Sequence, residues 1–332
     1  MARGVKQSVS APCNYNLGMS LDWEKILSES GITLTGIDIG CSSGRPHQWE
    51  RFGDALQYVG IDPLENEIKR LNDLNHPNSR YIPGLLTFEG VKGHADEGTV
   101  KFFRRTSASY DQQSGYDQKA TTFNSGLEVI ENLGSYSVLD LLKDFKGKPL
   151  DLLKIDIDGD DFLAMKAFFD HGMGENLLML DIESQFHGDV GEKGNTIWNI
   201  GKLANEKELF LYDITINRYS RSLLPSKYVY DFPAQTRFGQ VLWGDSLFFR
   251  DSVNENLANN SIIKLIALYE VFDLFDCALE ALLTHEVRIN KIIPTAEIAK
   301  ALRDQSNRRE NANSQNEPLP IALKRIVKKL LR

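Results

Sequence analysis

The stretch Gly36-Ile37-Asp38-Ile39-Gly40-Cys41-Ser42-Ser43-Gly44 decides the fold, because it places a glycine turn directly after a short apolar strand. Glycine lets the backbone approach a ligand closely, and a helix that follows such a turn offers unpaired N–H groups. The spacing matches neither the dinucleotide pattern G-x-G-x-x-G nor the phosphate-binding pattern G-x-x-x-x-G-K-[ST]. The turn therefore indicates a ligand that needs close contact with the backbone but carries no phosphate.

An acid follows at the end of the next apolar run, in Tyr58-Val59-Gly60-Ile61-Asp62-Pro63. A carboxylate at that place in a doubly wound sheet can accept both hydroxyls of a ribose. Alternatively, Asp62 only caps the helix expected from Glu65, and the turn only serves the fold. The two features in this order predict a site for the adenosyl part of S-adenosylmethionine (SAM), formed by Asp38, Gly40, Cys41, Ser42, Gly44, Asp62 and Pro63.

The chain up to Arg250 alternates between strand-like and helix-like segments. Strands are expected at 33–38, 57–62, 81–88, 150–156, 177–182, 209–214 and 245–250. Helices are expected at 21–28, 65–74, 137–145, 162–169 and 197–208. This alternation predicts an α/β fold with a doubly wound, mainly parallel, seven-stranded sheet, with a hairpin inserted within 85–105 and a polar loop at 115–134.

A block of acids follows the strand expected at 150–156, and it consists of Asp156, Asp158, Asp160 and Asp161. These carboxylates repel one another, so burial or a cation must offset the cost. Hard oxygen ligands suit Mg²⁺ or Ca²⁺, and a carboxylate at this edge of a sheet could also act as a base. Alternatively, Asp160 or Asp161 is only the N-cap of the following helix, and the whole block is structural.

The neighbouring strand ends with Asp181, Glu183 and His187, and the two acids alternate onto one face. His187 is a second candidate base, although a single histidine in a loop is more often a solvated side chain. Lys154 shares a face with Asp156 and could pair with an acid or orient a substrate. The candidate catalytic residues are thus Asp156, Asp158, His187 and Lys154, and the candidate metal ligands are Asp156, Asp158 and Asp181.

Four motifs together resemble the FkbM family of SAM-dependent methyltransferases. The resemblance rests on GIDIGCSSG at 36–44, YVGIDPLENEI at 58–68, TSASY at 106–110 and, most specifically, LLKIDIDGD at 152–160. It covers about residues 31–250. Asp158 and Asp160 or Asp161 stand where family members often carry Glu, which shortens the reach of each carboxylate. The resemblance implies a Rossmann-like class I methyltransferase that transfers a methyl group to oxygen, commonly on sugars, lipid-linked glycans or secondary metabolites.

Beyond Asp251 the apolar residues recur at helical spacing, which predicts a helical subdomain or a dimer contact. The predicted organisation is therefore an N-terminal segment with one helix, a methyltransferase domain, a helical subdomain, and a linker with a basic amphipathic tail, at residues 1–30, 31–252, 253–304 and 305–332. The tail could lie on an anionic membrane, or it could equally dock on the acidic body or on a partner.

Composition limits the function classes. The net charge is −8 although the tail is basic, so the main domain is acidic, and we expect no nucleic-acid partner but a small-molecule or glycan acceptor. Cys13, Cys41 and Cys277 lie far apart, which argues against disulfides and zinc, and no signal peptide or membrane span is expected. We therefore expect a cytoplasmic enzyme, peripheral to a membrane at most, that uses SAM with Mg²⁺ as an optional aid. The alternative is a methyltransferase-fold protein that binds a ligand or partner without turnover.

Overall fold

A computed structural model describes residues 21–87, 95–96, 99–100, 102–105, 127–130, 134–157, 160–187, 194–219, 239–253 and 256–316. The chain divides into two compact units. Among the described residues, the first unit extends from Glu24 to Val253, and the second comprises residues 21–23 and 256–316. Each unit is described by itself below.

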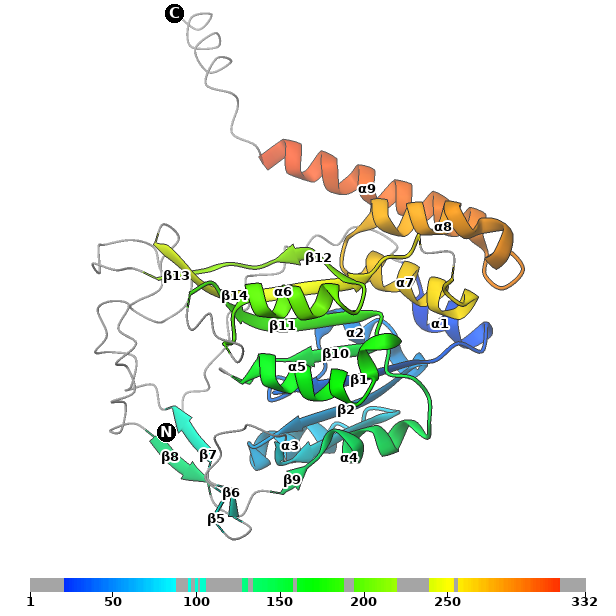
Figure 1. The fold of residues 1–332 in the computed structure, drawn as a ribbon. Coiled ribbons are helices and arrows are strands. Elements are labelled where there is room, and N and C mark those ends of the chain that lie inside the picture. Colours follow the sequence, from blue (N-terminus) through cyan, green and yellow to red (C-terminus); the bar gives the residue numbers. More distant parts are fainter. Residues whose placement is uncertain are drawn as a thin grey trace, which may run out of the picture. The chain divides into compact units, whose positions relative to one another are not determined.

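The first unit is built on a central sheet, which has eight strands within the described residues (Figure 1). The strand order is β12-β14-β11-β10-β1-β2-β3, with β13 paired to β14. β3, β2, β1, β10 and β11 pair in parallel, whereas β14 is antiparallel to both β11 and β12. The bounds are β1 Leu34–Ile39, β2 Leu56–Asp62, β3 Ser79–Pro83, β10 Leu152–Ile155, β11 Met179–Gln185, β12 Leu209–Ile214, β13 Asn217–Tyr219 and β14 Gln240–Arg250. The predicted doubly wound, mainly parallel sheet is confirmed, and the short β13 is the strand that the sequence pattern missed.

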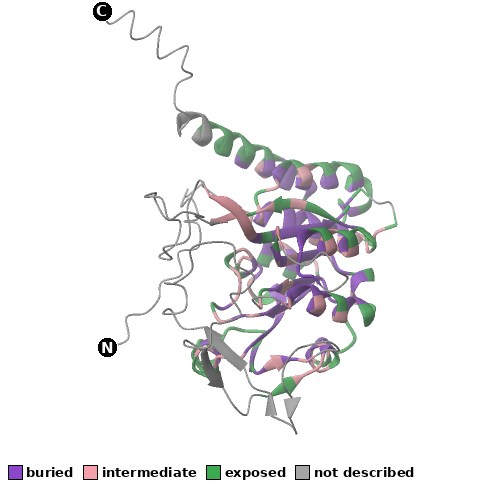
Figure 2. Cartoon of the chain, turned by 60° about the vertical axis from the view of Figure 1, so that its left-hand side comes forward, coloured by how far each residue is buried: buried purple, intermediate pink, exposed green. Residues whose placement is uncertain are grey.

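Helices cover the sheet because the central strands are buried along both faces, as the fully buried β1 illustrates. The bounds are α1 Trp23–Glu29, α2 His47–Glu50, α3 Glu65–Asp73, α4 Val138–Leu142, α5 Asp161–Asp170 and α6 Ile197–Asn205. The main core lies between one face of the sheet and the helices α4, α5 and α6, where buried residues such as Ile37, Ile155 and Phe168 pack together. Figure 2 shows these buried residues concentrated in the strands and on the inner sides of the helices.

A break after β3 divides the strand expected at 81–88. β4 (Leu85–Leu86) leaves the central sheet and pairs in parallel with β9 (Ser135–Tyr136). A Cβ atom at Gly84 would lie 2.6 Å from the ring of Tyr136, so the close approach of these two segments requires glycine there. The expected hairpin within 85–105 corresponds to β5 (Ala95–Asp96) and β6 (Thr99–Val100), while β7 (Phe102–Arg105) pairs with β8 (Leu127–Ile130) inside the expected loop.

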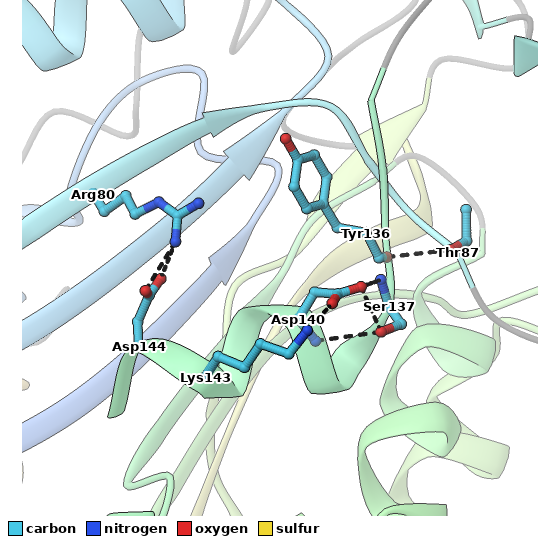
Figure 3. A network of polar contacts seen from close by, with 7 residues as sticks. All are labelled: Arg80, Thr87, Tyr136, Ser137, Asp140, Lys143 and Asp144. Atoms are coloured by element: carbon cyan, nitrogen blue, oxygen red, sulfur yellow. Dashed lines mark hydrogen bonds and ion pairs between the residues drawn. The ribbon is translucent and has the colours of Figure 1, made fainter. Parts of the chain in front are cut away.

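Polar contacts fix the chain where it re-enters the domain after β9 (Figure 3). Ser137 and Asp140 form a reciprocal capping box at the start of α4, which satisfies backbone N–H groups at both residues. Arg80 on β3 donates to both carboxylate oxygens of Asp144, at 2.8 and 2.7 Å. Thr87 donates from its backbone N–H to the carbonyl oxygen of Tyr136 at 2.8 Å. Both ends of the insertion between β4 and β9 are thus held against the domain.

The second unit contains α7 (Asn259–Val271), α8 (Phe275–Ile289) and α9 (Thr295–Asn316). A helical region was predicted here, but the expected linker from residue 305 is wrong as far as residue 316, because α9 continues through it. The polar composition of α9 did not reveal the few contacts that hold it: Leu302 and Gln305 are buried, and Arg309 forms an ion pair with Asp273 at 2.9 Å. The basic tail at 317–332 lies outside the described residues. Within the described ranges, no helix is long and apolar enough to cross a membrane.

Candidate functional site

Three strand ends meet at the glycine turn. Gly40 has φ +91° and Gly44 φ +90°, a backbone region that favours glycine. The N–H of Gly40 donates to Ile61 at 2.9 Å, and the N–H of Asp156 donates to Ile39 at 2.9 Å. A Cβ atom at Gly40 would overlap the carbonyl oxygen of Asp156. The turn is therefore a tight joint between β1, β2 and β10, with its backbone at the carboxyl edge of the sheet.

Cys41 points into the protein rather than toward that edge. Its side chain is fully buried, and a Cβ atom at Gly60 would lie 2.6 Å from its sulfur. Burial raises the pKa of the Cys41 thiol well above its usual value, so the thiol stays neutral. Cys41 thus seats the turn on β2, and Ser42 and Pro63 beside it are half-buried.

Asp62 ends β2 next to the turn and is 6% exposed. The N–H of Leu64 donates to its Oδ1 at 2.8 Å. Burial raises the pKa of Asp62, although backbone hydrogen bonds from Leu64 and Ser42 oppose the shift. Asp62 is not the N-cap of α3, since that position belongs to Leu64, which makes no side-chain capping bond. Asp62 thus holds the turn that precedes α3 and does not cap the helix itself.

A partly buried lysine, Lys154, joins the acids of neighbouring strands. Asp38, Lys154 and Asp181 stand side by side in the registers of β1, β10 and β11. The Nζ of Lys154 lies 3.5 Å from Oδ1 of Asp38 and 3.3 Å from Oδ2 of Asp156. Tyr58 donates to the other oxygen of Asp38 at 2.9 Å, and Asp38 is only 1% exposed. Asp156, at the edge of the sheet, keeps 46% of its side chain exposed.

The environment shifts the pKa values of this cluster strongly. Burial raises the pKa of Asp38, and it raises the pKa of Asp181 to about 7. Burial also raises the pKa of Asp245 on β14, although a 2.9 Å hydrogen bond from Thr215 opposes the shift. Burial alone would lower the pKa of Lys154, but the surrounding carboxylates more than reverse this, so its pKa lies above the usual value. Lys154 is therefore a permanent cation among competing acids.

The predicted metal site at Asp156, Asp158 and Asp181 is not supported. No group of three His, Cys, Asp or Glu side chains within the described ranges has an arrangement that could hold a metal ion. Asp158 lies outside those ranges. The cation that offsets the charges of Asp38 and Asp156 is the ammonium group of Lys154, which lies within 3.5 Å of both. This removes the electrostatic reason for which a metal was expected.

Part of the acid block is structural, as one interpretation of the sequence held. Asp161 is fully buried, and it accepts hydrogen bonds at 2.9 Å from the N–H of Ile157 and from the side-chain amide of Asn195. Asn195 in turn accepts from the N–H of Phe162 at 3.0 Å. Asp160 is the N-cap residue of α5, without a side-chain capping bond. Asp161 and Asn195 thus tie the loop after β10 to the loop before α6.

The remaining candidate base, His187, follows β11. Its Nε2 lies 3.1 Å from the side-chain nitrogen of Gln240 on β14. The structure brings together Asp38, Lys154, Asp156 and Asp181, and it joins Gly40 to Asp156 and Asp62 through the strand ends. The sequence pattern missed Tyr58, Asn195 and Asp245. Tyr58 and Asp245 could have been found by strand alternation, whereas Asn195 carried no signal because its partner is 34 residues away.

No protein-family model matches this chain, and no curated protein matches it. Three solved structures illustrate what the chain is similar to. A TehB-like SAM-dependent methyltransferase from Corynebacterium glutamicum shares 13% identity over 70% of this chain and 90% of that chain, with a TM-score of 0.26. A putative tRNA (m1A22) methyltransferase from Streptococcus pneumoniae shares 8% identity over 87% of this chain and 100% of that chain, with a TM-score of 0.27. The 23S rRNA methyltransferase ErmE shares 10% identity over 87% of this chain and 100% of that chain, with a TM-score of 0.26.

The strand order, with one antiparallel strand between β11 and β12, is that of a doubly wound, mainly parallel α/β sheet. The narrower resemblance to the FkbM family stays a prediction. The prediction that excluded a nucleic-acid partner is wrong, because RNA methyltransferases are among the similar structures. The physical error was to judge a partner from the net charge of a whole domain, whereas contact with a phosphate backbone depends on the local surface.

Proposed function

We propose that this protein is a SAM-dependent methyltransferase that methylates a hydroxyl group. The observation that carries the proposal is the pairing of a buried acid, Asp62, with a glycine turn at the neighbouring strand end. The positive φ angles of Gly40 and Gly44 allow the tight turn that brings its backbone to the carboxyl edge of the sheet, and Asp62 provides a desolvated acceptor for two ribose hydroxyls. The residues present therefore fit the adenosyl group of SAM.

SAM, when bound, supplies an activated methyl group. The contribution of this chain is to hold the acceptor and to take the proton that its hydroxyl loses. Asp156 fits the second role because its carboxylate is half-exposed at the strand edge and is oriented by the Nζ of Lys154 at 3.3 Å. His187 is the alternative base. Lys154 and Asp38 would then be positioning residues, since both are oriented toward other protein groups.

Fewer observations support the class of methyl acceptor than support the cofactor site. A sugar, a glycan or a related polyol is the acceptor that the FkbM resemblance implies, and a carboxylate base suits a hydroxyl acceptor. RNA belongs in the same acceptor screen because its ribose hydroxyls offer the same chemistry. Metal assistance is not part of the proposal, since the Nζ of Lys154 lies within 3.5 Å of Asp38 and Asp156 and offsets part of their charge.

Calorimetric titration of SAM and of S-adenosylhomocysteine tests the cofactor site. Replacing Asp62 with alanine should weaken binding by about tenfold to a hundredfold, because hydrogen bonds to a charged group contribute about 1.5–3 kcal/mol. Asp73→Ala is the matched control, as it removes an exposed acid at the end of α3. Equal binding by the two variants would contradict the assignment of Asp62. Absence of binding by the unaltered protein would instead favour a methyltransferase-fold protein without turnover.

A second experiment separates the chemistry from binding. Asp156→Asn keeps the shape of the side chain but removes its basicity, so turnover should fall by about a hundredfold or more while SAM affinity changes little. His187→Gln is the matched test of the alternative base. If Asp156→Asn retains full turnover and His187→Gln does not, the base is His187. If both variants retain full turnover, neither residue takes the proton.

A further inference from the structure

The exposed side of α8 carries an acidic and apolar stripe, which consists of Asp276, Glu280, Leu283 and Val287. Their spacing of four, three and four residues places them in one line along the helix. All four are exposed, and the two apolar members are unusually so, at 49% for Leu283 and 87% for Val287. The stripe is acidic at the N-terminal half of α8 and apolar at its C-terminal half.

The opposite side of α8 explains why the helix does not need this stripe for folding. Its buried residues are Phe275, Ala278, Ala281, Leu282, His285 and Ile289. They recur at the same helical spacing and form a buried face that is apolar except for His285, and α7 and α9 pack against α8. The stripe is therefore a second contact surface on a helix whose first face is already occupied.

We propose that the basic C-terminal segment Ile321–Arg332 of the same chain docks on this stripe. Its sequence places apolar residues at helical spacing, namely Leu323, Ile326, Val327, Leu330 and Leu331. The cations fall between them, namely Lys324, Arg325, Lys328, Lys329 and Arg332. This pattern complements a surface that offers both exposed apolar side chains and exposed carboxylates.

The direction of the chain supports the pairing. Arg309, late in α9, forms an ion pair with Asp273 at 2.9 Å and lies 6.0 Å from the ring centre of Phe275. The end of α9 thus lies beside the start of α8, and the two helices run in opposite directions. A segment that turns back after α9 would run parallel to α8, from its acidic half to its apolar half.

The length of the chain also suffices. From Arg309 to Asn316 the helix extends about 10 Å further, at about 1.5 Å per residue. The five steps from Asn316 to Ile321 span up to about 17 Å, which covers the return of about 10 Å along α8. The passage around α8, which is about 10–12 Å wide, uses the further steps up to Lys324. Twelve helical residues are about 18 Å long, against about 22 Å for the fifteen residues of α8. Lys324 and Arg325 would then face Asp276 and Glu280.

The energetics favour contact within one chain. A helix of twelve residues is marginal alone in water, so this segment gains order only by burying its apolar side. A short connection gives a tethered segment an effective concentration of about 1 mM, so even weak intrinsic affinity suffices for docking. Opposite charges add specificity to the register.

Disulfide cross-linking in the full-length protein tests the proposal. Val287→Cys and Leu331→Cys are combined in a background with Cys13→Ser and Cys277→Ser, and the rate of cross-linking under mild oxidation is measured. The matched control joins Leu331→Cys to Ser306→Cys, an exposed position on α9 within similar reach. We expect the Val287 pair to react about tenfold faster and to yield a product of monomer size. Adding Asp276→Lys and Glu280→Lys should reduce the rate toward that of the control.

Two outcomes overturn the proposal. If the Val287 pair reacts no faster than the Ser306 pair, the segment does not occupy the stripe. If the product has the size of a dimer, the contact belongs to a second copy of the chain. In the first case, sedimentation with phosphatidylserine vesicles tests where the segment binds instead. If deleting residues 318–332 abolishes vesicle binding, the segment binds a membrane surface.

Discussion

Toward the C-terminal ends of the central strands, the two faces of the sheet carry opposite kinds of side chain, although alternating residues of the same strands supply both. On the face beneath α4, α5 and α6, the strands present residues such as Ile37, Ile155 and Leu180, all buried in one apolar cluster. On the other face, the neighbouring residues of the same strands are Asp38, Lys154 and Asp181. The pleat separates the two sets by a single position along each strand.

The difference shows where the domain gains stability and where it gives stability up. Each fully buried aliphatic side chain stabilises the fold by about 1.5–3 kcal/mol. Desolvating acids and a lysine costs free energy that their mutual attraction returns only in part. Charged groups with strongly shifted pKa values at the ligand edge of a sheet are candidates for function. The comparison predicts that the two faces respond differently to mutation and to pH.

The largest effect is expected on the apolar face. Phe168→Ala should lower the free energy of unfolding by about 4 kcal/mol, because it leaves a cavity in the core between α5 and the sheet. The loss should not depend on pH, and SAM affinity of the folded protein should stay unchanged. Chemical denaturation and calorimetry measure the two quantities. Phe210→Ala, at an exposed position on β12, is the control, and an equal loss there would contradict the interpretation.

On the charged face, Lys154→Met should cost about 3 kcal/mol at neutral pH, because Asp38 is left buried without its cation. Adding Asp38→Asn should restore much of the loss, since the unpaired charge disappears. Lys166→Met, which removes an exposed partner of Asp170, should cost well under about 1 kcal/mol. Urea denaturation of the four proteins tests this. A double variant no more stable than Lys154→Met would show that the ion pair is not the cause.

The next largest effect is expected in the pH dependence of stability, to which the charged face contributes and the apolar face does not. Burial raises the pKa of Asp181 to about 7, from 3.8 in an unfolded chain. Between these values the folded protein holds a proton that the unfolded chain has lost, so stability falls as pH rises, by up to about 1.4 kcal/mol per pH unit. Asp38, Asp62 and Asp245 are shifted in the same direction.

Replacing Asp181 with asparagine should therefore flatten the pH dependence between about pH 4 and pH 7. Thermal unfolding at several pH values, with Glu175→Gln as a control at an exposed acid, measures the slope. The control should leave the falling part of the curve in place, because its partner Lys207 lowers the pKa of Glu175. An unchanged slope in Asp181→Asn would contradict the raised pKa.

The smallest effect is expected outside both faces. Arg80 and Asp144 form a bidentate ion pair on the surface, as Figure 3 shows. Arg80→Met should cost only about 0.5 kcal/mol, because water screens the charges and the side chains lose freedom on pairing. Denaturation at low and high salt checks this, since the difference should shrink in salt. A loss as large as that of Lys154→Met would mean that burial is not what separates the two pairs.

Local pattern was enough to predict most of the fold. The strands observed at Leu34–Ile39, Leu56–Asp62 and Leu209–Ile214 begin and end within a residue of those expected, because apolar runs bounded by Gly, Asp or Glu are short and unambiguous. The glycine turn was predictable for the same reason. The linker from residue 305 was predicted wrongly, because α9 is held by a few long-range contacts that its polar composition does not reveal.

The candidate site was predictable residue by residue but not as an arrangement. Sequence alternation placed Lys154 and Asp156 on one face, yet it suggested a metal among the acids. Only the register of β1, β10 and β11 puts the ammonium group of Lys154 within 3.5 Å of both Asp38 and Asp156. Likewise, the sequence showed Asp161 only as one of four neighbouring acids. The hydrogen bond from Asn195, which only the tertiary structure reveals, shows that Asp161 has a structural role.

The sequence by itself determined the elements, their order and the glycine turn, because these depend on residues that are close along the chain. Tertiary structure decided which acids are paired, which are buried and which reach the edge of the sheet. The physical reason is that the charge state of a carboxyl group depends on its desolvation and on its nearest cation. Both are set by strands that lie 116 residues apart in sequence yet side by side in space, as Asp38 and Lys154 are.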